Sequence, residues 1–134
     1  RRDVLRRLFR SRDVWLSVAF SPEGKFVLGG NSDSTIHLWD VASGKDVRIF
    51  KGHKGQVSSV AFSPGGALVL SSGGEDHTIR LWDVSSGKEI DRIDLTSAND
   101  LAYAVVFSPD GRSFLAGTKR RVILHFELLD ANAT

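Results

Sequence analysis

The sequence predicts an all-β fold in which three similar antiparallel sheets follow one another along the chain. One tetrapeptide, Ala19-Phe20-Ser21-Pro22, recurs at 61–64 and, as Val-Phe-Ser-Pro, at 106–109. A second segment, Ile36-His37-Leu38-Trp39-Asp40, recurs at 79–83 and in a decayed form at 123–127. Both landmarks keep a spacing of 42 to 45 residues, and no segment has helical spacing for more than two turns. A period of about 40 to 45 residues that contains a Trp-Asp pair is typical of four-stranded β-propeller blades.

The first strand of each repeat is expected at residues 15–20, 57–62 and 102–107, where it ends at a Ser-Pro pair or just before it. That pair is followed by Glu23-Gly24, by Gly65-Gly66 or by Asp110-Gly111. Pro fixes φ and Gly tolerates a positive φ, so each of these segments predicts a tight hairpin turn. The second strand is then expected at residues 26–29, 67–71 and 113–116.

The third strand is expected at residues 35–40, 78–83 and 122–127, which are rich in the Ile, Leu and Trp that strands favour. A turn at 42–45 or 85–88 leads to a fourth strand at 46–50 or 89–95, and the third repeat has none of its own. We therefore divide the chain into a first blade (13–52), a second blade (53–96) and a third blade (97–134). Residues 1–10 are expected to be a strand that completes another blade.

Two stretches of the chain, VAFSPEGKFVLGGNSDSTIHLWDVASGK and VAFSPGGALVLSSGGEDHTIRLWDVSSGK, resemble blades of the WD-repeat (Trp-Asp repeat) family nearly position by position. The resemblance covers residues 4 to 128 and is weaker in the third blade, where the Trp-Asp pair has become Phe126-Glu127. It implies a scaffold without catalytic activity that binds proteins or peptides on the faces of the propeller.

The resemblance also implies a structural role for four polar residues of the second blade, because in the family pattern they form a hydrogen-bonded tetrad: His53, Ser72, Asp76 and Trp82. Trp only donates, a carboxylate only accepts, and a hydroxyl and an imidazole do both, so the four can satisfy one another in a buried place. A Ser-His-Asp hydrolase would need an accessible hydroxyl and an oxyanion hole, which this spacing does not offer. We therefore expect no catalytic residue, cofactor or metal site.

The other two blades lack this tetrad. The first blade has Gly29 where the second has its serine, and the third has Ala116 there, with Ala98 in the position of the histidine. Apolar packing is expected to hold these two blades.

A partner-binding face is expected where the loops before each first strand and the tight turns before each third strand emerge. Aromatic and Arg side chains are the usual anchors at such surfaces. The candidates by blade equivalence are Arg12, Val14, Leu16, Ser32, Lys54, Gln56, Ser58, Glu75, Asn99, Leu101, Tyr103 and Lys119.

The start of the chain corresponds to the fourth strand of a repeat, because residues 4–8 align without gaps on residues 46–50, the expected fourth strand of the first blade. Three blades cannot close a ring, since propellers have about four to eight. We expect the ring to be completed by other chains, with Val4, Leu5, Leu8 and Phe9 of one copy completing the third blade of the next. Such head-to-tail strand exchange gives a homodimer of six blades or a homotrimer of nine. The alternative is a C-terminal fragment of a longer WD-repeat propeller without independent activity.

Charge is distributed unevenly, because residues 1–12 hold six Arg and one Asp, whereas the remainder carries 12 basic and 15 acidic side chains. A basic arm of this kind leaves a nucleic-acid binder open as a third reading, although Phe9 is its one aromatic residue. There is no Cys, no signal peptide is visible, and no apolar run reaches the roughly 20 residues of a membrane span. The absence of Cys and of a visible signal peptide favours a cytoplasmic location. The alignment of the chain start with a fourth strand, and not these features, favours a scaffold whose first partner is a second copy of itself.

Overall fold

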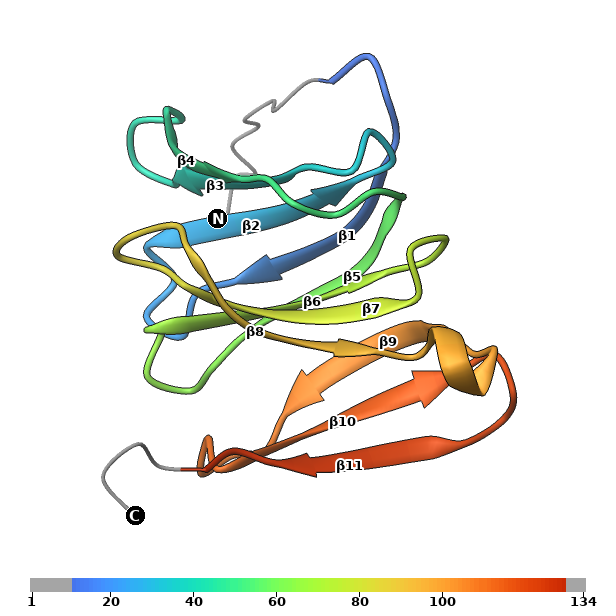
Figure 1. Ribbon diagram of the computed structural model, residues 1–134. Helices are drawn as coiled ribbons and strands as arrows, with labels where there is room; N and C mark the ends of the chain where they lie inside the picture. The colour runs from blue at the N-terminus through green and yellow to red at the C-terminus, as the bar shows by residue number, and fades with distance from the viewer. Residues whose placement is uncertain (1–10, 130–134) are drawn as a thin grey trace, which may run out of the picture.

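A computed structural model of the chain describes residues 11–129, and their regular structure is β-strand apart from one short 3₁₀ turn, η1 (Thr96–Ala98). The strands form three antiparallel sheets that stack on one another (Figure 1). The first sheet contains β1 (Trp15–Phe20), β2 (Phe26–Asn31), β3 (Ile36–Asp40) and β4 (Asp46–Phe50) in that order. The second contains β5 (Val57–Phe62), β6 (Leu68–Gly73), β7 (Thr78–Asp83) and β8 (Glu89–Asp94), and the third contains β9 (Ala102–Phe107), β10 (Ser113–Thr118) and β11 (Ile123–Glu127). The predicted all-β fold is confirmed.

The first strand of each sheet has the expected bounds, but the second strands end two residues later than expected. The additional residues pair with the starts of the first strands, as Asn31 does with Trp15, Gly73 with Val57, and Thr118 with Ala102. A register shift beside each of these pairs marks a β-bulge, which lets the ladder continue past an irregular step. The glycines at these strand ends therefore belong to the ladder and not to the turn.

The three hairpins between first and second strands are built alike. In each, a serine hydroxyl accepts the backbone N–H at the far side of the turn, as Ser21 does from Phe26 at 2.9 Å and Ser63 does from Leu68 at 3.0 Å. Gly24, Gly66 and Gly111 lie in these turns with φ between +72° and +79°, a region that favours glycine. The turn chemistry predicted from Ser-Pro and Gly is therefore present in all three repeats.

The core consists of two apolar layers between neighbouring sheets. The layer between the first and second sheets contains Leu28, Ile36, Leu38, Phe50, Val57, Val60, Val69 and Trp82. The layer between the second and third sheets contains Leu70, Ile79, Leu81, Leu95, Ala102, Val105, Phe107, Phe114 and Ala116. Each fully buried large aliphatic side chain contributes about 1.5 to 3 kcal/mol to stability, so these layers hold the stack together.

One serine on the first strand of the first sheet and one on the first strand of the second sheet add polar links between sheets. Ser17 Oγ on β1 accepts the backbone N–H of Val60 on β5 at 3.1 Å, and Ser59 Oγ on β5 accepts that of Val105 on β9 at 3.1 Å. These two inter-sheet hydrogen bonds are equivalent, because each follows the bulge of its own strand. They fix the position of each first strand along its neighbour in the next sheet.

Candidate functional site

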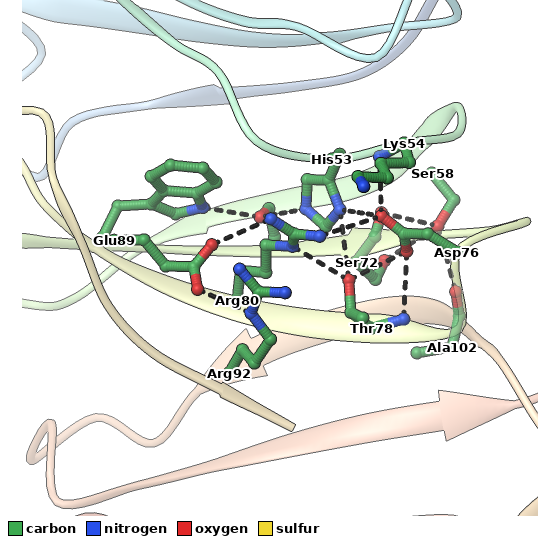
Figure 2. A network of polar contacts seen from close by, with 12 residues as sticks. His53, Lys54, Ser58, Ser72, Asp76, Thr78, Arg80, Glu89, Arg92 and Ala102 are labelled. Carbon is green, nitrogen blue, oxygen red and sulfur yellow. Dashed lines mark hydrogen bonds and ion pairs between the residues drawn. The ribbon is translucent and has the colours of Figure 1, made fainter. Parts of the chain in front are cut away.

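The largest polar cluster among residues 11–129 lies in the second sheet, on the side that faces the first (Figure 2). Trp82 Nε1 donates to Ser71 Oγ at 2.8 Å, and His53 Nε2 lies 2.7 Å from the same hydroxyl. Because Ser71 accepts from the indole, its own proton is free to be donated to His53 Nε2. The other ring nitrogen, His53 Nδ1, lies 2.8 Å from Asp76 Oδ2 and carries the proton of that hydrogen bond.

Asp76 is the acceptor at the end of this chain of hydrogen bonds. Its Oδ2 also accepts the backbone N–H of Lys54 at 3.0 Å, and its Oδ1 accepts the Thr78 hydroxyl at 2.8 Å and the Thr78 N–H at 3.0 Å. Burial by itself would raise the pKa of Asp76, but the hydrogen bonds from His53, Lys54 and Thr78 outweigh burial and hold the pKa well below its usual value. The carboxylate is therefore charged and fully engaged.

Arg80 extends the cluster toward the outer strand, a role that the sequence analysis missed. The guanidinium is 3% exposed and donates to Thr78 Oγ1 at 3.0 Å and to Glu89 Oε1 at 2.9 Å. Arg92 donates to the second oxygen of Glu89 at 2.7 Å. The sequence signal was Arg80 between the apolar residues Ile79 and Leu81 of β7, because a charged side chain is tolerated in a buried strand only when it has a partner.

The hydroxyl of the tetrad is Ser71, so the prediction of Ser72 was wrong by one position. Ser72 points to the opposite side of β6, where its hydroxyl lies 2.8 Å from Ser58 Oγ. Successive side chains on a strand alternate between its two faces, so a shift of one residue exchanges the two environments. The structural equivalent of Gly29 and Ala116 is therefore Ser71, which pairs with Arg80 as Gly29 does with His37.

This arrangement does not provide a nucleophile. Ser71 is fully buried, and its oxygen is held between an indole N–H and an imidazole, so no substrate carbonyl can reach it. The part of the chain that the structure describes contains no group of three or more His, Cys, Asp or Glu side chains that could hold a metal ion. Within that part, the cluster is equipped to hold the second sheet together.

The first and third sheets place aromatic side chains where the second has this network. In the first, Trp15 meets Trp39 edge to face with ring centroids 4.9 Å apart, and a Cβ on Gly29 would lie 2.9 Å from the Trp39 ring. In the third, Phe126 takes the place of Trp82 and stacks on Phe114 at 5.0 Å. Ring contacts therefore contribute to both arrangements, and the first sheet also keeps the hydrogen bonds that join Asp33, Thr35 and His37.

The predicted partner-binding residues gather at one end of the stack, where the β2–β3, β6–β7 and β10–β11 turns lie (right in Figure 1). Nine of the twelve are exposed, and Ser32, Ser58 and Leu101 are half-buried. Two of these three form hydrogen bonds within the fold. Ser32 Oγ accepts the N–H of Val14 at 2.9 Å, and Ser58 Oγ donates to the Ala102 carbonyl oxygen at 3.0 Å. We call this end of the molecule the turn face. It consists of the ten other candidates: Arg12, Val14, Leu16, Lys54, Gln56, Glu75, Asn99, Leu101, Tyr103 and Lys119.

The turns of the turn face are aligned by one repeated hydrogen bond. The N–H of Ser32, Gly74 and Lys119 donates to the carbonyl of Val14, Gln56 and Leu101 respectively, at 2.9, 2.9 and 3.0 Å. The equivalent of Ser32 and Lys119 is therefore Gly74, and Glu75 is one additional residue in the second turn. The predicted closure strand, with Val4, Leu5, Leu8 and Phe9, lies outside the described residues.

Comparison with known proteins gives a consistent result. The sequence profile of the family described as "WD domain, G-beta repeat" matches residues 5–40 and 44–83, which is more than half of the chain. The second matched segment covers β4 to β7, so the sequence unit begins one strand earlier than the sheet. The first matched segment likewise begins with residues of the proposed closure strand.

Three relatives show how far the likeness extends. Transcription initiation factor TFIID subunit 5 of Caenorhabditis elegans is 41% identical over 40% of this chain and 8% of its own length. A U3 snoRNP-associated protein-like protein of Oryza sativa is 42% identical over 41% of this chain and 11% of its own. A probable serine/threonine-protein kinase of Thermomonospora curvata is 50% identical over 28% of this chain and 5% of its own. The chain thus spans between 5% and 11% of the length of these relatives.

Proposed function

Because this chain belongs to the WD domain, G-beta repeat family, we propose that it is a protein-interaction scaffold that binds a protein or peptide segment on its turn face. Its sheets are β-propeller blades, and the proposal keeps the assignment of no enzymatic activity. The likeness to a kinase covers 5% of that protein and lends no support to kinase chemistry here. Among residues 11–129 no helix is long and apolar enough to cross a membrane.

The observation that carries this proposal is the contrast between the buried network and the turn face. The side chains best suited to chemistry, His53 and Asp76, are engaged with each other. Lys54, Gln56, Asn99 and Tyr103 are exposed, and Tyr103 is 56% exposed although it is aromatic. Together with Arg12 and Leu16 near the start of the first sheet, these residues present one surface at the ends of β-strands, and proteins commonly display their binding residues in this way.

A displayed library of random peptides, selected on the full chain, tests this proposal. We expect enriched peptides whose binding is lost in a variant with Lys54→Glu and Tyr103→Ala. The matched control is Lys45→Glu with Lys88→Glu, two exposed residues of the β3–β4 and β7–β8 turns at the opposite end of the stack. Failure to enrich any peptide, or equal loss in the control, would overturn the proposal.

A second observation favours self-assembly. Leu115 and Ile123 on the free side of the third sheet are 42% and 74% exposed. Their equivalents are buried wherever a further sheet follows: Leu28, Leu70 and Ile36 are 0% exposed and Ile79 is 1% exposed. On the outer face of the first sheet, Val18 and Phe20 are 68% and 69% exposed. Both end sheets thus carry the apolar side chains of an inter-blade contact.

We propose that a second copy of the chain covers these surfaces head to tail, with residues 1–10 completing the third sheet of the next copy beside β11. A rotation that closes gives a ring of two or three chains. Light-scattering mass of the purified chain tests this, and we expect a dimer or trimer that dissociates when residues 1–10 are deleted. A monomer, or a polydisperse aggregate, would instead support a chain whose missing blades come from elsewhere.

A further inference from the structure

The β10–β11 turn of the third sheet has the same backbone as the β2–β3 turn but the opposite charge. Thr118 N donates to the Val122 carbonyl at 3.0 Å and Arg121 N to the Thr118 carbonyl at 3.2 Å, which reproduces the bonds of the first turn. Arg120 therefore occupies the place of Asp33. In the second sheet the same place is held by Asp76, the acceptor of the buried network.

Arg120 stands between two further cations, so the turn carries three consecutive exposed positive side chains: Lys119, Arg120 and Arg121. No carboxylate among residues 11–129 forms an ion pair with any of them. The acid of this region, Asp100, is 6% exposed, and its Oδ1 accepts the backbone N–H groups of Leu101 at 2.8 Å and Arg120 at 3.1 Å. The carboxylate thus replaces the turn aspartate as a backbone acceptor. Burial by itself would raise the pKa of Asp100, but the hydrogen bonds that Asp100 accepts, together with the positive charge of Arg120, lower it, and Arg120 remains exposed.

A groove of about 300 Å³ lies beside these cations, in the place that the polar network fills in the second sheet. Its lining residues are Leu95, Ala98, Asp100, Arg120, Val122 and Leu124. By the repeat offsets, Ala98, Val122 and Leu124 correspond to His53, Thr78 and Arg80. At these three positions the third blade therefore has apolar side chains where the second blade has polar members of its network. The volume is at the lower end of the roughly 300 to 1,000 Å³ of ligand pockets.

We propose that this groove binds a linear segment of a partner protein in which an aliphatic side chain is flanked by acidic residues. The inference rests on the interaction function proposed above and names the chemistry of the partner. The aliphatic side chain would occupy the space between Leu95 and Leu124, and the acidic residues would face Lys119, Arg120 and Arg121. Opposite charges of this kind direct partner choice and accelerate association.

Two other occupants fit the groove less well. Residues 1–12 of a second copy carry six Arg, so even where they pair with β11 they supply no negative charge to the three cations. Single-stranded nucleic acid uses aromatic side chains on which its bases stack, and the lining of the groove contains none. An acidic protein segment agrees with both the charge of the rim and the apolar character of the floor.

Fluorescence anisotropy with labelled synthetic peptides tests the proposal on the full chain. The probe is a peptide of Glu-Glu-Leu repeats, and the comparison peptides replace every Glu by Gln or every Leu by Gly. We expect the probe to bind at least tenfold more tightly than either comparison peptide, with an affinity that falls as salt is added. Equal binding of the probe and the peptide without Leu would show that only charge contributes to binding, and it would overturn the proposal that the groove binds an aliphatic side chain.

Two variants and one control complete the test. Lys119→Glu with Arg120→Glu should reduce probe affinity at least tenfold, and Ala98→Trp, which fills the groove at an exposed position, should abolish the preference for Leu. Lys45→Glu with Lys88→Glu makes the same change in net charge at the opposite end and should leave binding within about twofold. If the acidic probe does not bind while the peptide library still yields binders to the turn face, the proposed groove ligand is wrong and the proposed scaffold function is retained. If both fail, the scaffold is wrong as well.

Discussion

The second and third sheets of this chain share strand order, turn chemistry and inner-strand packing, but they hold their strands together by different means. In the second sheet a chain of hydrogen bonds runs from Trp82 through Ser71 and His53 to Asp76. In the third, Phe126 stacks on Phe114 where that chain would lie. Hydrogen bonds in a buried network depend on every member, whereas ring contacts tolerate change. The polar residues of the second blade thus stabilise the fold, whereas in the third blade Lys119, Arg120 and Arg121 are exposed, and we propose that they bind a partner.

Removal of the Asp76 carboxylate should have the largest effect on this comparison. The Asp76→Ala change leaves the Lys54 N–H, the Thr78 N–H and His53 without their acceptor, and it leaves Arg80 with one counter-charge fewer. We expect a loss of about 3 kcal/mol in the free energy of unfolding, measured with urea. The matched change Asp33→Ala in the exposed turn of the first sheet should cost about 1 kcal/mol or less. Equal losses would show that burial of the network contributes nothing.

The same carboxylate should govern stability in acid. Its pKa in the folded chain lies below the ordinary value of 3.8, so the unfolded chain binds protons more readily than the folded chain does. The stability that Asp76 contributes is therefore fully present above about pH 4 and is lost as the pH falls toward the folded-state pKa. An Asp76→Asn variant should show a flatter dependence of unfolding free energy on pH between about 4 and 2. A wild-type curve that is flat in this range would contradict the assignment.

The two adjacent serines of β6 should differ in their contribution to stability. Ser71→Ala leaves both Trp82 Nε1 and His53 Nε2 without a partner and should cost about 2 kcal/mol. Ser72→Ala removes only the contact with Ser58 and should cost about 1 kcal/mol. Thermal unfolding followed by tryptophan fluorescence measures both. The reverse order would restore Ser72 to the tetrad.

A serine placed at the equivalent position of the third sheet should destabilise rather than stabilise. Ala116 is 0% exposed, and neither Phe126 nor Ala98, which stand where Trp82 and His53 stand in the second sheet, offers a hydrogen-bond partner. An Ala116→Ser hydroxyl would therefore be buried without a partner, at a cost of about 1 to 2 kcal/mol. Urea unfolding of the variant measures this cost, and a gain in stability would show that the third sheet retains a hidden polar partner.

These residues also show what the sequence can and cannot predict. The repeat fixes strand number and order, because both landmarks recur with one period and the turn residues are specific for their turns. Ser71 and Ser72 are adjacent and identical in type, so their roles depend on which face of β6 each occupies. The offset between the first two repeats changes from 42 to 43 residues in the β6–β7 turn, because Glu75 is an additional residue there, and a count made back from β7 therefore reaches Ser72 instead of Ser71. The Arg80–Glu89 pair joins residues nine positions apart across a hairpin, and its distance follows only once the register is known.

The smallest expected effect concerns the serine links between sheets. Ser59→Ala removes the acceptor of the Val105 N–H and should cost about 1 kcal/mol, with faster hydrogen exchange at that amide. The equivalent position in the third sheet is Ala104, which has no hydroxyl with which to accept from a following sheet. Ala104→Ser should therefore leave the stability of the isolated chain unchanged within about 0.5 kcal/mol. If head-to-tail copies do form, the same variant should strengthen their association, because the introduced hydroxyl would then accept the Val18 N–H of the next copy. An Ala104→Ser variant with unchanged association would argue that the next sheet does not come from this chain.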